Sequence, residues 1–546
     1  MMISFRAKNL LLQNSVPVIL FFFLFSCTPS ENSQKTHQPG GEKLNHNGLE
    51  AYYDASLKPF YHGVASGDPL PESVIIWTRV TPDYHQEVKV NYAVATDSEM
   101  KAVVKKGTIT TDSSKDYTVK ADVQDLEAGT YYYYQFEALG KKSITGRMKT
   151  APKDSTKNIR LAFASCSNYS WGYFNAYRTM AEDTLDAVVH LGDYIYEYAT
   201  DVYSHPQLIR KHIPNKELVA LTDYRTRYAQ YRLDKNLQAV HSAHPFIVIW
   251  DDHELANNAY ETGAGNHQPE EGDWNTRLAA AQKAYYEWMP VREKKDPQLY
   301  RSFTFGNHVR LIMLDTRTEG RSEQVYDHND AAFYDTTRKM ISDEHFNWLT
   351  SELNQKETWK VIGNQVLFSK LKVFFSEKGE PYYDGWDGYP YQKLKFWREL
   401  CNKPGVVFVT GDFHSSFVIH DDVGLYDCKC HQYSTEFVVP SITSANYDED
   451  YGLDSAKIYT EWYNKANEHV EKIDFLSGGK NKWMECRPYN YNGKYLNYTN
   501  LIDHGYFILE LDEKEGKGIF RFAETILDKK NEKYRDVVFR ITPYGL

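Results

Sequence analysis

The sequence predicts an α/β domain that follows a small all-β domain. From Ile159 onward, apolar strand-like runs alternate with helical segments, which is the pattern of an α/β domain with buried central strands. From about Tyr52 to Thr150, short β-rich runs are separated by turn residues, and this spacing fits a small sandwich. With 546 residues, the chain is long enough for both domains.

The first residues predict an export signal. A short basic start precedes the apolar stretch Leu10–Phe25, whose unbroken part is too short to span a bilayer comfortably. The stretch ends in Leu24–Cys27, which resembles a bacterial lipobox, a signal whose cysteine becomes the lipidated N-terminus of the mature chain. We therefore predict a lipoprotein signal over residues 1–27 with lipidation at Cys27. An ordinary cleaved signal with a chance cysteine is the alternative.

The segment after the signal is predicted to be a flexible tether over residues 28–50. From Thr28 to Asn47 it is polar, and Leu44 is its only large apolar residue. Such a segment cannot bury enough surface to offset the entropy lost on ordering. It would link an anchored Cys27 to the folded body.

The all-β domain is predicted over residues 51–152. Turn chemistry separates its strands, as at Ser66–Pro69, and Leu126–Tyr134 resembles the turn into a late strand of fibronectin type III modules. The linker Ala151–Asp154 follows. The predicted strands are Ser73–Arg79, Glu87–Ala95, Tyr117–Val123 and Thr130–Ala138.

The α/β domain is predicted over residues 153–546. Its expected strands are Ile159–Ala164, Ala187–His190, Phe246–Trp250, Val309–Leu314, Trp359–Gly363 and Val406–Thr410, with an antiparallel pair at Phe507–Leu511 and Gly518–Phe522. Helical composition is seen at Gly172–Met180, Leu208–Arg227 and Arg277–Glu287. The region Tyr447–Asn500 has little clear periodicity, so we predict loops there.

Polar residues follow three of these strands directly, at Gly192-Asp193, Asp251–Glu254 and Gly411–His414. Each of these segments, taken alone, is typical of a capped or solvated turn. Together they predict that hard ligands converge at one edge of a sheet, because two adjacent carboxylates in a buried setting need a compensating cation. A metal-dependent hydrolytic site is the first hypothesis.

The charge of the chain limits its partners. A formal net charge of −11 argues against a nucleic-acid scaffold, which would carry a basic face. It leaves room for a local cationic pocket that receives an anionic substrate.

At this point the chain resembles a known family, the alkaline phosphatase D (PhoD-like) phosphatases within the metallophosphoesterases. The resemblance covers nearly all of the chain after the signal, and its motifs are long and ordered. It implies a metallophosphoesterase-type βαβ sandwich for the α/β domain, which would be the catalytic domain, and a PhoD-like N-terminal domain for the all-β part. The matching segments are Phe60–Pro69, Ile75–Val80, Ala164–Cys166, His190–Tyr198, Trp250–Asn258, Gly363–Gln365 and Gly411–Ser416.

The resemblance also implies a ligand set for a first metal. Most metallophosphoesterases place Asp-x-His after the first strand, whereas this chain has Cys166 there, as the PhoD-like group does. By position, Cys166, Asp193, Tyr196 and His414 look like its ligands. A thiolate with a phenolate favours a ferric ion.

Asp193 would bridge to a second metal. Asp252 and Asp412 are its implied further ligands, with Asn364 as a weaker candidate. All-oxygen ligation suits Ca²⁺ or another hard divalent cation. The family thus implies Fe³⁺ with Ca²⁺.

The implied chemistry is direct, in-line attack of a metal-bound hydroxide on phosphorus. His253 would stabilise transition-state charge or protonate the leaving oxygen, and Glu254 would orient that imidazole. Arg178 is a candidate phosphate contact, and an arginine on a helix surface is the equally weighted alternative.

These inferences predict an exported, lipid-anchored phosphomonoesterase or phosphodiesterase of the cell envelope, in the outer membrane or periplasm. We expect a monomer that acts on a small-molecule or polymeric phosphate ester. A phospholipase-like or teichoic-acid-type phosphodiesterase is the alternative among enzymes. A non-catalytic surface-binding lipoprotein is the alternative outside them.

Overall fold

The computed structural model describes residues 42–154, 158–207, 210–293, 298–373, 380–422, 433–467 and 495–546. The predicted signal and its lipidated Cys27 lie outside the described residues, as does most of the predicted tether. The described end of that tether packs against the body. Leu44 and Leu49 are buried, and Lys43 forms a β-bridge with Tyr84. These two leucines bury because they supply apolar surface that the rest of the segment lacks.

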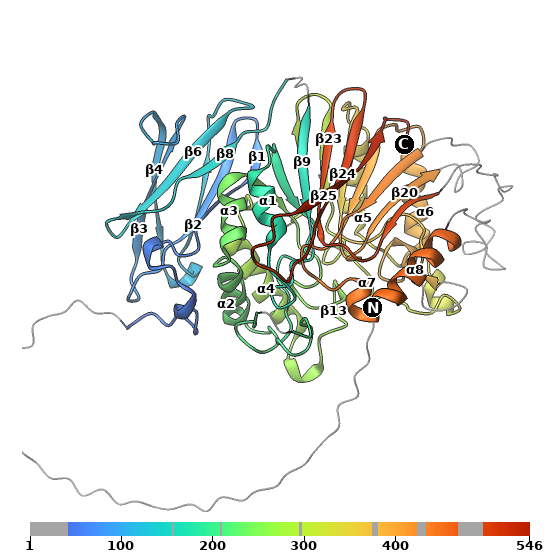
Figure 1. The fold of residues 1–546 in the computed structure, drawn as a ribbon, viewed down its shortest axis with the longest axis horizontal. Coiled ribbons are helices and arrows are strands. Elements are labelled where there is room, and N and C mark those ends of the chain that lie inside the picture. Colours follow the sequence, from blue (N-terminus) through green and yellow to red (C-terminus); the bar gives the residue numbers. More distant parts are fainter. Residues whose placement is uncertain are drawn as a thin grey trace, which may run out of the picture. The chain divides into compact units, whose positions relative to one another are not determined.

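A nine-stranded sheet runs through most of the described chain, in the order β25-β24-β23-β9-β10-β11-β1-β2-β5. Strands β9, β10, β11 and β1 are parallel neighbours, and the other pairs are antiparallel (Figure 1). The bounds are β1 Val64–Leu70, β2 Ser73–Arg79, β5 Thr118–Val123, β9 Ile159–Ala164, β10 Ala187–His190, β11 Pro245–Val248, β23 Gly505–Leu511, β24 Gly516–Ala523 and β25 Tyr534–Ile541.

A seven-stranded sheet has the order β14-β15-β16-β19-β21-β20-β22. Its bounds are β14 Arg301–Phe305, β15 Val309–Met313, β16 Trp359–Asn364, β19 Val406–Thr410, β20 Ser416–Asp422, β21 Tyr433–Val438 and β22 Leu496–Asn500. One apolar core joins the two large sheets, and Phe437 of β21 stacks on Phe507 of β23 with ring centroids 4.7 Å apart. The two sheets therefore form the sandwich of the catalytic part.

A five-stranded sheet completes the all-β part, in the order β4-β3-β6-β7 with β8 also paired to β6. Its bounds are β3 Val88–Ala95, β4 Val103–Thr111, β6 Tyr131–Ala138, β7 Lys141–Lys142 and β8 Gly146–Lys149. Its core includes residues of β2 and β5, so it packs on the end of the nine-stranded sheet. Because β1 pairs with β11, the all-β part shares a continuous sheet with the catalytic part.

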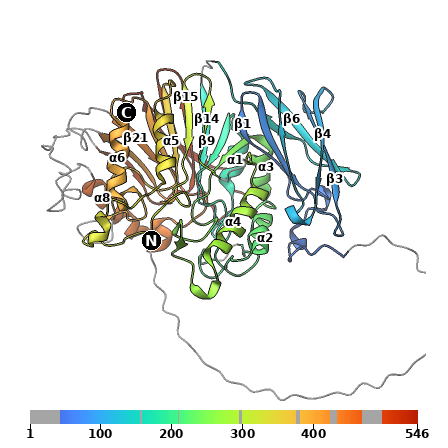
Figure 2. The ribbon, with the colours of Figure 1, turned by 180° about the vertical axis from the view of Figure 1, so that it is seen from behind.

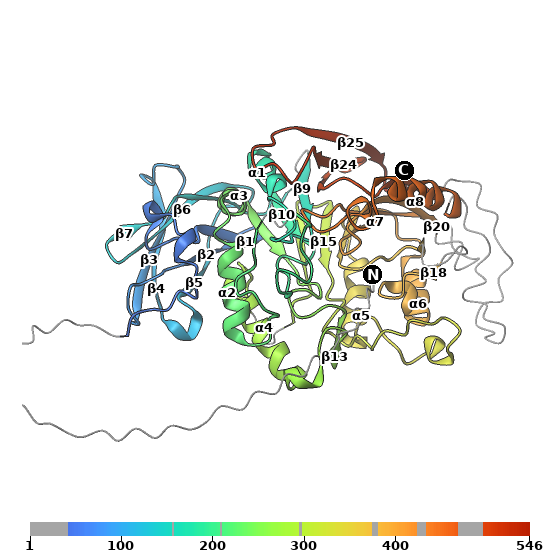
Figure 3. The same cartoon turned by 60° about the horizontal axis from the view of Figure 1, so that its bottom comes forward.

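Helices cover the outer faces of both large sheets. Side chains of α5 and α6 share a core with β15, β16 and β19. The two helices lie beside this sheet (Figure 2), and α2 packs against α4 (Figure 3). The bounds are α1 Asn175–Glu182, α2 Leu221–Tyr231, α3 Lys235–Ala243, α4 Trp274–Trp288, α5 Asp343–Leu353, α6 Pro390–Leu400, α7 Tyr447–Tyr451 and α8 Leu453–Ala466. Short strands are β12 Ala259–Tyr260, β13 Gly263–Ala264, β17 Lys372–Val373 and β18 Glu380–Pro381. Among the described residues, no helix is both long and apolar enough to cross a membrane.

The α/β fold class is confirmed, with three corrections to the expected helices. The helix predicted from Leu208 begins only at Leu221, because Pro214 removes a backbone donor and obstructs the turn before it. Three helices, α3, α5 and α6, were not predicted. The region from Tyr447 contains α7 and α8 rather than loops alone.

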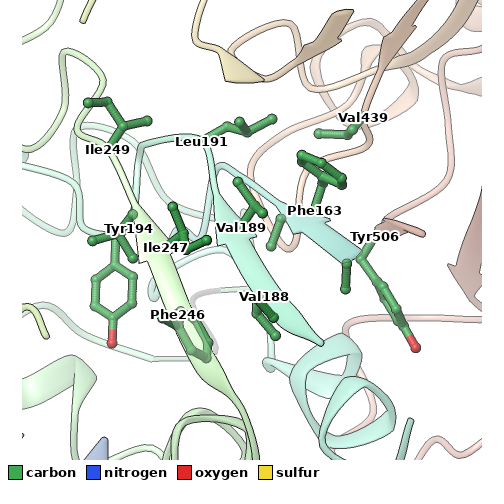
Figure 4. Packing of buried hydrophobic residues seen from close by; sticks show 14 of the residues in the cluster. Phe163, Val188, Val189, Leu191, Tyr194, Phe246, Ile247, Ile249, Val439 and Tyr506 are labelled. Atoms are coloured by element: carbon green, nitrogen blue, oxygen red, sulfur yellow. The ribbon is translucent and has the colours of Figure 1, made fainter. Parts of the chain in front are cut away.

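The centre of the nine-stranded sheet is apolar on both faces, as parallel strands require. Val188 and Val189 of β10 lie between Phe163 of β9 and Phe246 and Ile247 of β11 (Figure 4), and all five are fully buried. This packing holds the three strands rigidly and fixes where their carboxyl ends lie.

Candidate metal centre

The predicted metal ligands come from the carboxyl ends of parallel strands in both large sheets. Cys166 follows β9, Asp193 follows β10 and Asp252 follows β11 in the nine-stranded sheet. In the seven-stranded sheet, Asn364 ends β16 and Asp412 follows its neighbour β19. The two sheets pack on each other, so these ends meet at one place.

Several of these residues adopt left-handed backbone conformations. Such φ values are uncommon for residues other than glycine and concentrate at functional sites. Gly192 precedes Asp193 with φ 113°, and a Cβ there would lie 2.3 Å from Cβ of Asp251, so glycine is required. The values are 59° at Cys166, 57° at Asp193, 60° at Asp412 and 58° at His414.

The first half of the site joins Cys166, Asp193, Tyr196 and His414. One ligand atom from each of Cys166, Asp193 and His414 lies within 4.8 Å of the others. The Tyr196 hydroxyl donates to Asp193 Oδ2 at 3.0 Å and lies 3.3 Å from His414 Nε2. His414 Nδ1 donates to the carbonyl of Ala445 at 3.0 Å, which leaves Nε2 for the cluster. The structure therefore brings the four predicted ligands of the first metal together.

The second half joins the carboxylates Asp251, Asp252 and Asp412, which also meet the 4.8 Å criterion. Asp252 and Asp193 form a further such group with His253, so the two halves are contiguous. Asp251 Oδ2 and Asp252 Oδ1 are buried without a hydrogen-bond partner among the described residues. Buried carboxylate oxygens that lack a hydrogen-bond donor could instead be stabilised by a bound cation.

The electrostatics also fit a cation. Burial, and then repulsion by neighbouring carboxylates, raise the pKa of Asp193 well above its usual value, although His253 opposes the shift. Burial likewise raises the pKa of Asp251, and raises that of Asp412 to about 6 although Arg317 opposes both. Crowded carboxylates with raised pKa values are typical of sites that a metal ion completes. The donor set, which combines carboxylates with a thiol, a phenol and an imidazole, therefore fits a metal centre.

Arg317 is a residue of the site that the sequence did not predict, and Glu197, described below, is another. Arg317 is fully buried, and its guanidinium pairs with Asp251, lies 2.8 Å from Asp384, and lies 3.5 to 3.6 Å from Asp412 and Asp252. Arg317 follows β15 after a short turn, at the same kind of strand end as the predicted residues. That position was the available signal for it.

The prediction that Glu254 orients the His253 imidazole is wrong, because Glu197 takes that place. His253 Nδ1 donates to Glu197 Oε2 at 2.7 Å, and the other oxygen of Glu197 accepts from the Asn257 amide and the Asn266 side chain. The Glu254 carboxylate instead accepts from the backbone amides of Asp193, Tyr194 and Asp251, at 2.7 to 2.9 Å. The turn that follows β11 directs Glu254 inward, so it fastens two strand ends and Glu197 orients the imidazole.

The remaining two predicted residues are placed as follows. Asn364 is buried, and its side chain donates to the Val366 carbonyl and lies 3.4 Å from the Trp386 indole nitrogen. Its role as a ligand stays a prediction. Arg178, on α1, donates to the Asn531 carbonyl and lies 3.6 Å from Glu532. Through these contacts Arg178 binds the segment between β24 and β25. This agrees with the alternative that it is an arginine on a helix surface.

Known proteins resemble the chain over nearly its whole described length. The profile of the PhoD-like phosphatase family matches residues 161–484, and that of the PhoD-like phosphatase N-terminal domain matches residues 49–152. Alkaline phosphatase D of Bacillus subtilis strain 168 is 38% identical over 451 residues, which are 78% of this chain and 75% of that protein. The solved structure of PhoD matches with a TM-score of 0.77 and 31% identity, over 90% of this chain and 92% of that one.

These matches confirm the predicted resemblance and exceed what a shared fold alone would give, because sequence identity extends through both parts of the chain. They also settle the choice between an enzyme and a binding lipoprotein in favour of the enzyme. The chain belongs to the PhoD-like phosphatase family and is a phosphoric ester hydrolase.

Proposed function

We propose that this chain is an exported, metal-dependent phosphoesterase that hydrolyses phosphomonoesters, phosphodiesters or both, without a covalent enzyme intermediate. The observation that carries the proposal is the contiguous cluster of thiol, phenol, imidazole and carboxylate groups at the strand ends, whose negative charge exceeds what Arg317 offsets. Bound metal ions would polarise a phosphoryl oxygen and lower the pKa of an attacking water.

The donor types divide the metals between the two halves. Cys166, Asp193, Tyr196 and His414 would hold a ferric ion, because thiolate and phenolate oxygen together favour Fe³⁺. Asp193, Asp252 and Asp412 offer only oxygen, which suits Ca²⁺ or another hard divalent cation, with Asn364 as a further candidate.

His253 would act on the leaving group. Its Nδ1 is engaged by Glu197, so Nε2 is the nitrogen that remains to donate a proton to the departing oxygen. Its side chain is 10% exposed, whereas that of Glu197 is fully buried. The imidazole is therefore the member of the pair that is placed to meet a substrate.

Arg317 would support the site without touching the substrate. Its side chain is fully buried and its guanidinium is occupied by carboxylates. It would offset part of their repulsion and hold Asp252 and Asp412 in place for the cation.

The sequence supports export and anchoring. The apolar stretch that ends at Cys27 would direct the chain through the membrane and leave it lipid-anchored in the cell envelope, in the outer membrane or periplasm. We expect a monomer whose substrate is a small-molecule or polymeric phosphate ester.

Metal analysis combined with two model esters tests the proposal. The purified protein should contain iron and calcium and should hydrolyse p-nitrophenyl phosphate, bis-p-nitrophenyl phosphate or both. His253→Ala should lower kcat by about 10²–10⁴-fold with the metal content unchanged, because only the leaving-group acid is removed. Hydrolysis of neither ester with both metals supplied would overturn the proposal.

A second measurement addresses the ferric ion alone. Fe³⁺ held by a phenolate and a thiolate should absorb visible light, and Tyr196→Phe should shift or remove that band. A colourless, iron-free and fully active protein would contradict the ferric assignment.

A further inference from the structure

Residues 441–446, in the segment between β21 and α7, lie directly behind the first half of the site. We call them the 441–446 loop. Its backbone amides at Thr443 and Ser444 both donate to the carbonyl of Cys166, each at 3.2 Å. The carbonyl of Ala445 accepts from His414 Nδ1 at 3.0 Å. One short loop thus contacts two of the proposed ligands of the first metal through its main chain.

The side chain of Ser444 reaches a third proposed ligand. Its hydroxyl lies 2.5 Å from the phenol oxygen of Tyr196 and 3.0 Å from the carbonyl of Cys166. Ser444 is fully buried, so the phenol is shielded from bulk solvent on that side. The contact with Tyr196 is at the short end of the normal range for two hydroxyl oxygens.

The loop is anchored from its far side. The Ser441 hydroxyl donates to the carbonyl of Ser444 at 2.7 Å and lies 2.9 Å from His504 Nδ1. His504 Nε2 in turn lies 3.2 Å from Glu449, which also accepts from the Trp171 indole at 2.7 Å. These buried contacts fix the position of the Ser444 backbone, and so fix where its hydroxyl points.

We propose that Ser444 is a positioning residue that holds the Tyr196 oxygen toward the first metal and draws electron density from that oxygen. The inference rests on the proposed function, in which Tyr196 binds iron. A hydroxyl that donates to a ligand oxygen lowers the energy of the electrons on that oxygen, in the way that partners of ligating side chains generally tune a metal. Ser444 contacts neither the substrate nor the reacting atoms.

The visible spectrum of the iron-loaded full chain tests this inference. Without the hydrogen bond, the phenolate should give up charge to iron more easily, so Ser444→Ala should move the absorption band to longer wavelength. Ser444→Thr keeps the hydroxyl and should restore the wild-type band. Ser369→Ala is the matched control, because Ser369 is another buried serine whose hydroxyl has no partner among the described residues.

The outcomes separate the two proposals. If the wild-type protein binds iron with a visible band and Ser444→Ala leaves that band in place at unchanged iron content, the inference about Ser444 is wrong and the iron assignment stands. If the wild-type protein shows no iron band, the assignment of the first metal fails before Ser444 is at issue. A loss of iron from Ser444→Ala, with the fold intact by circular dichroism and iron retained in Ser444→Thr, also supports the positioning role.

Discussion

The two halves of the candidate metal centre are supported in different ways. Behind Cys166, Tyr196 and His414, the 441–446 loop contributes neutral hydrogen bonds from backbone amides, a carbonyl and one hydroxyl. Behind Asp251 and the other carboxylates of the second half stands a buried guanidinium, which is itself held by a further carboxylate. One half is positioned by dipoles, and the other by a fixed positive charge.

This difference follows from the charges that each half carries. In the first half, the thiol, the phenol and the imidazole can all be neutral, and Asp193 is the one carboxylate, so this half can be buried at modest cost when it is hydrogen-bonded. Three carboxylates within 4.8 Å of one another cannot all be ionised in a buried site without a counter-charge. Arg317 supplies part of that charge permanently, and a bound cation would supply the rest.

Selective chelation of one metal is expected to have the largest effect and to distinguish the two halves most clearly. A chelator of hard divalent cations should remove the metal from the carboxylate half first, because thiolate and phenolate ligands retain iron more strongly. Hydrolysis should fall to background while the visible band remains, and added Ca²⁺ should restore activity. The measurements are ester hydrolysis, metal content and absorbance on the same sample. Loss of both metals in parallel would show that the halves do not differ in this way.

Removal of the buried guanidinium is expected to have the next largest effect. Arg317→Met leaves several carboxylates buried without their partner and should destabilise the metal-free protein by about 3–5 kcal/mol. Urea unfolding measures this loss, and added Ca²⁺ should recover part of it by binding the folded state. Arg317→Lys keeps the charge but not the planar fork, so its free energy of unfolding should lie between those of the wild type and the Met variant. A Met variant as stable as the wild type would refute the counter-charge role.

Most of the site could be predicted because its residues follow apolar strand runs. Asp193, Asp252 and Asp412 each come shortly after such a run, and parallel strands bring their carboxyl ends together. Arg317 also follows an apolar strand run. The sequence does not predict its role, because its partners lie far away in the sequence and nothing local marks a buried arginine. Whether these side chains bind metal is still a prediction.

Other features depended on three-dimensional contacts that the sequence does not display. Glu254 is adjacent to His253 in the chain, yet the turn directs its carboxylate to backbone amides, and Glu197 reaches the imidazole from another strand end. The 441–446 loop has no periodicity to mark it. By contrast, α3 carried a readable signal, since the side chain of Asp234 caps its first turn at 2.9 and 3.1 Å.

Substitution of Glu197 tests how His253, which lies between the two halves, is oriented. Glu197→Gln should lower kcat by about 10–100-fold with little change in KM, as loss of a partner that orients a site histidine typically does. Glu254→Gln is the comparison, because its carboxylate contacts backbone amides and should affect stability more than kcat. The two variants are measured by steady-state kinetics and thermal unfolding. The opposite ranking would return the orienting role to Glu254.

The smallest expected effect concerns the pair of His504 and Glu449 that anchors the 441–446 loop. Burial opposes protonation of His504, but the charges of Glu449 and Asp448 outweigh it and raise the histidine's pKa above its usual value of 6.5. Burial likewise opposes ionisation of Glu449, but His504 lowers the pKa of Glu449 below its usual 4.5. His504 therefore adds stability that is complete below pH 6.5 and is lost as the pH rises through its folded-state pKa. Glu449 adds stability above pH 4.5 that is lost as the pH falls through its own.

His504→Gln keeps hydrogen-bonding capacity but removes the charge, so it should cost about 1 kcal/mol of unfolding free energy. The cost should be greatest between the two usual pKa values, near 4.5 and 6.5, and should shrink toward alkaline pH. Urea unfolding of the wild type and the variant across this range measures it. A cost that grows with pH would mean that His504 is neutral in the folded protein. The neutral support of the first half would then extend to the anchor of the loop itself.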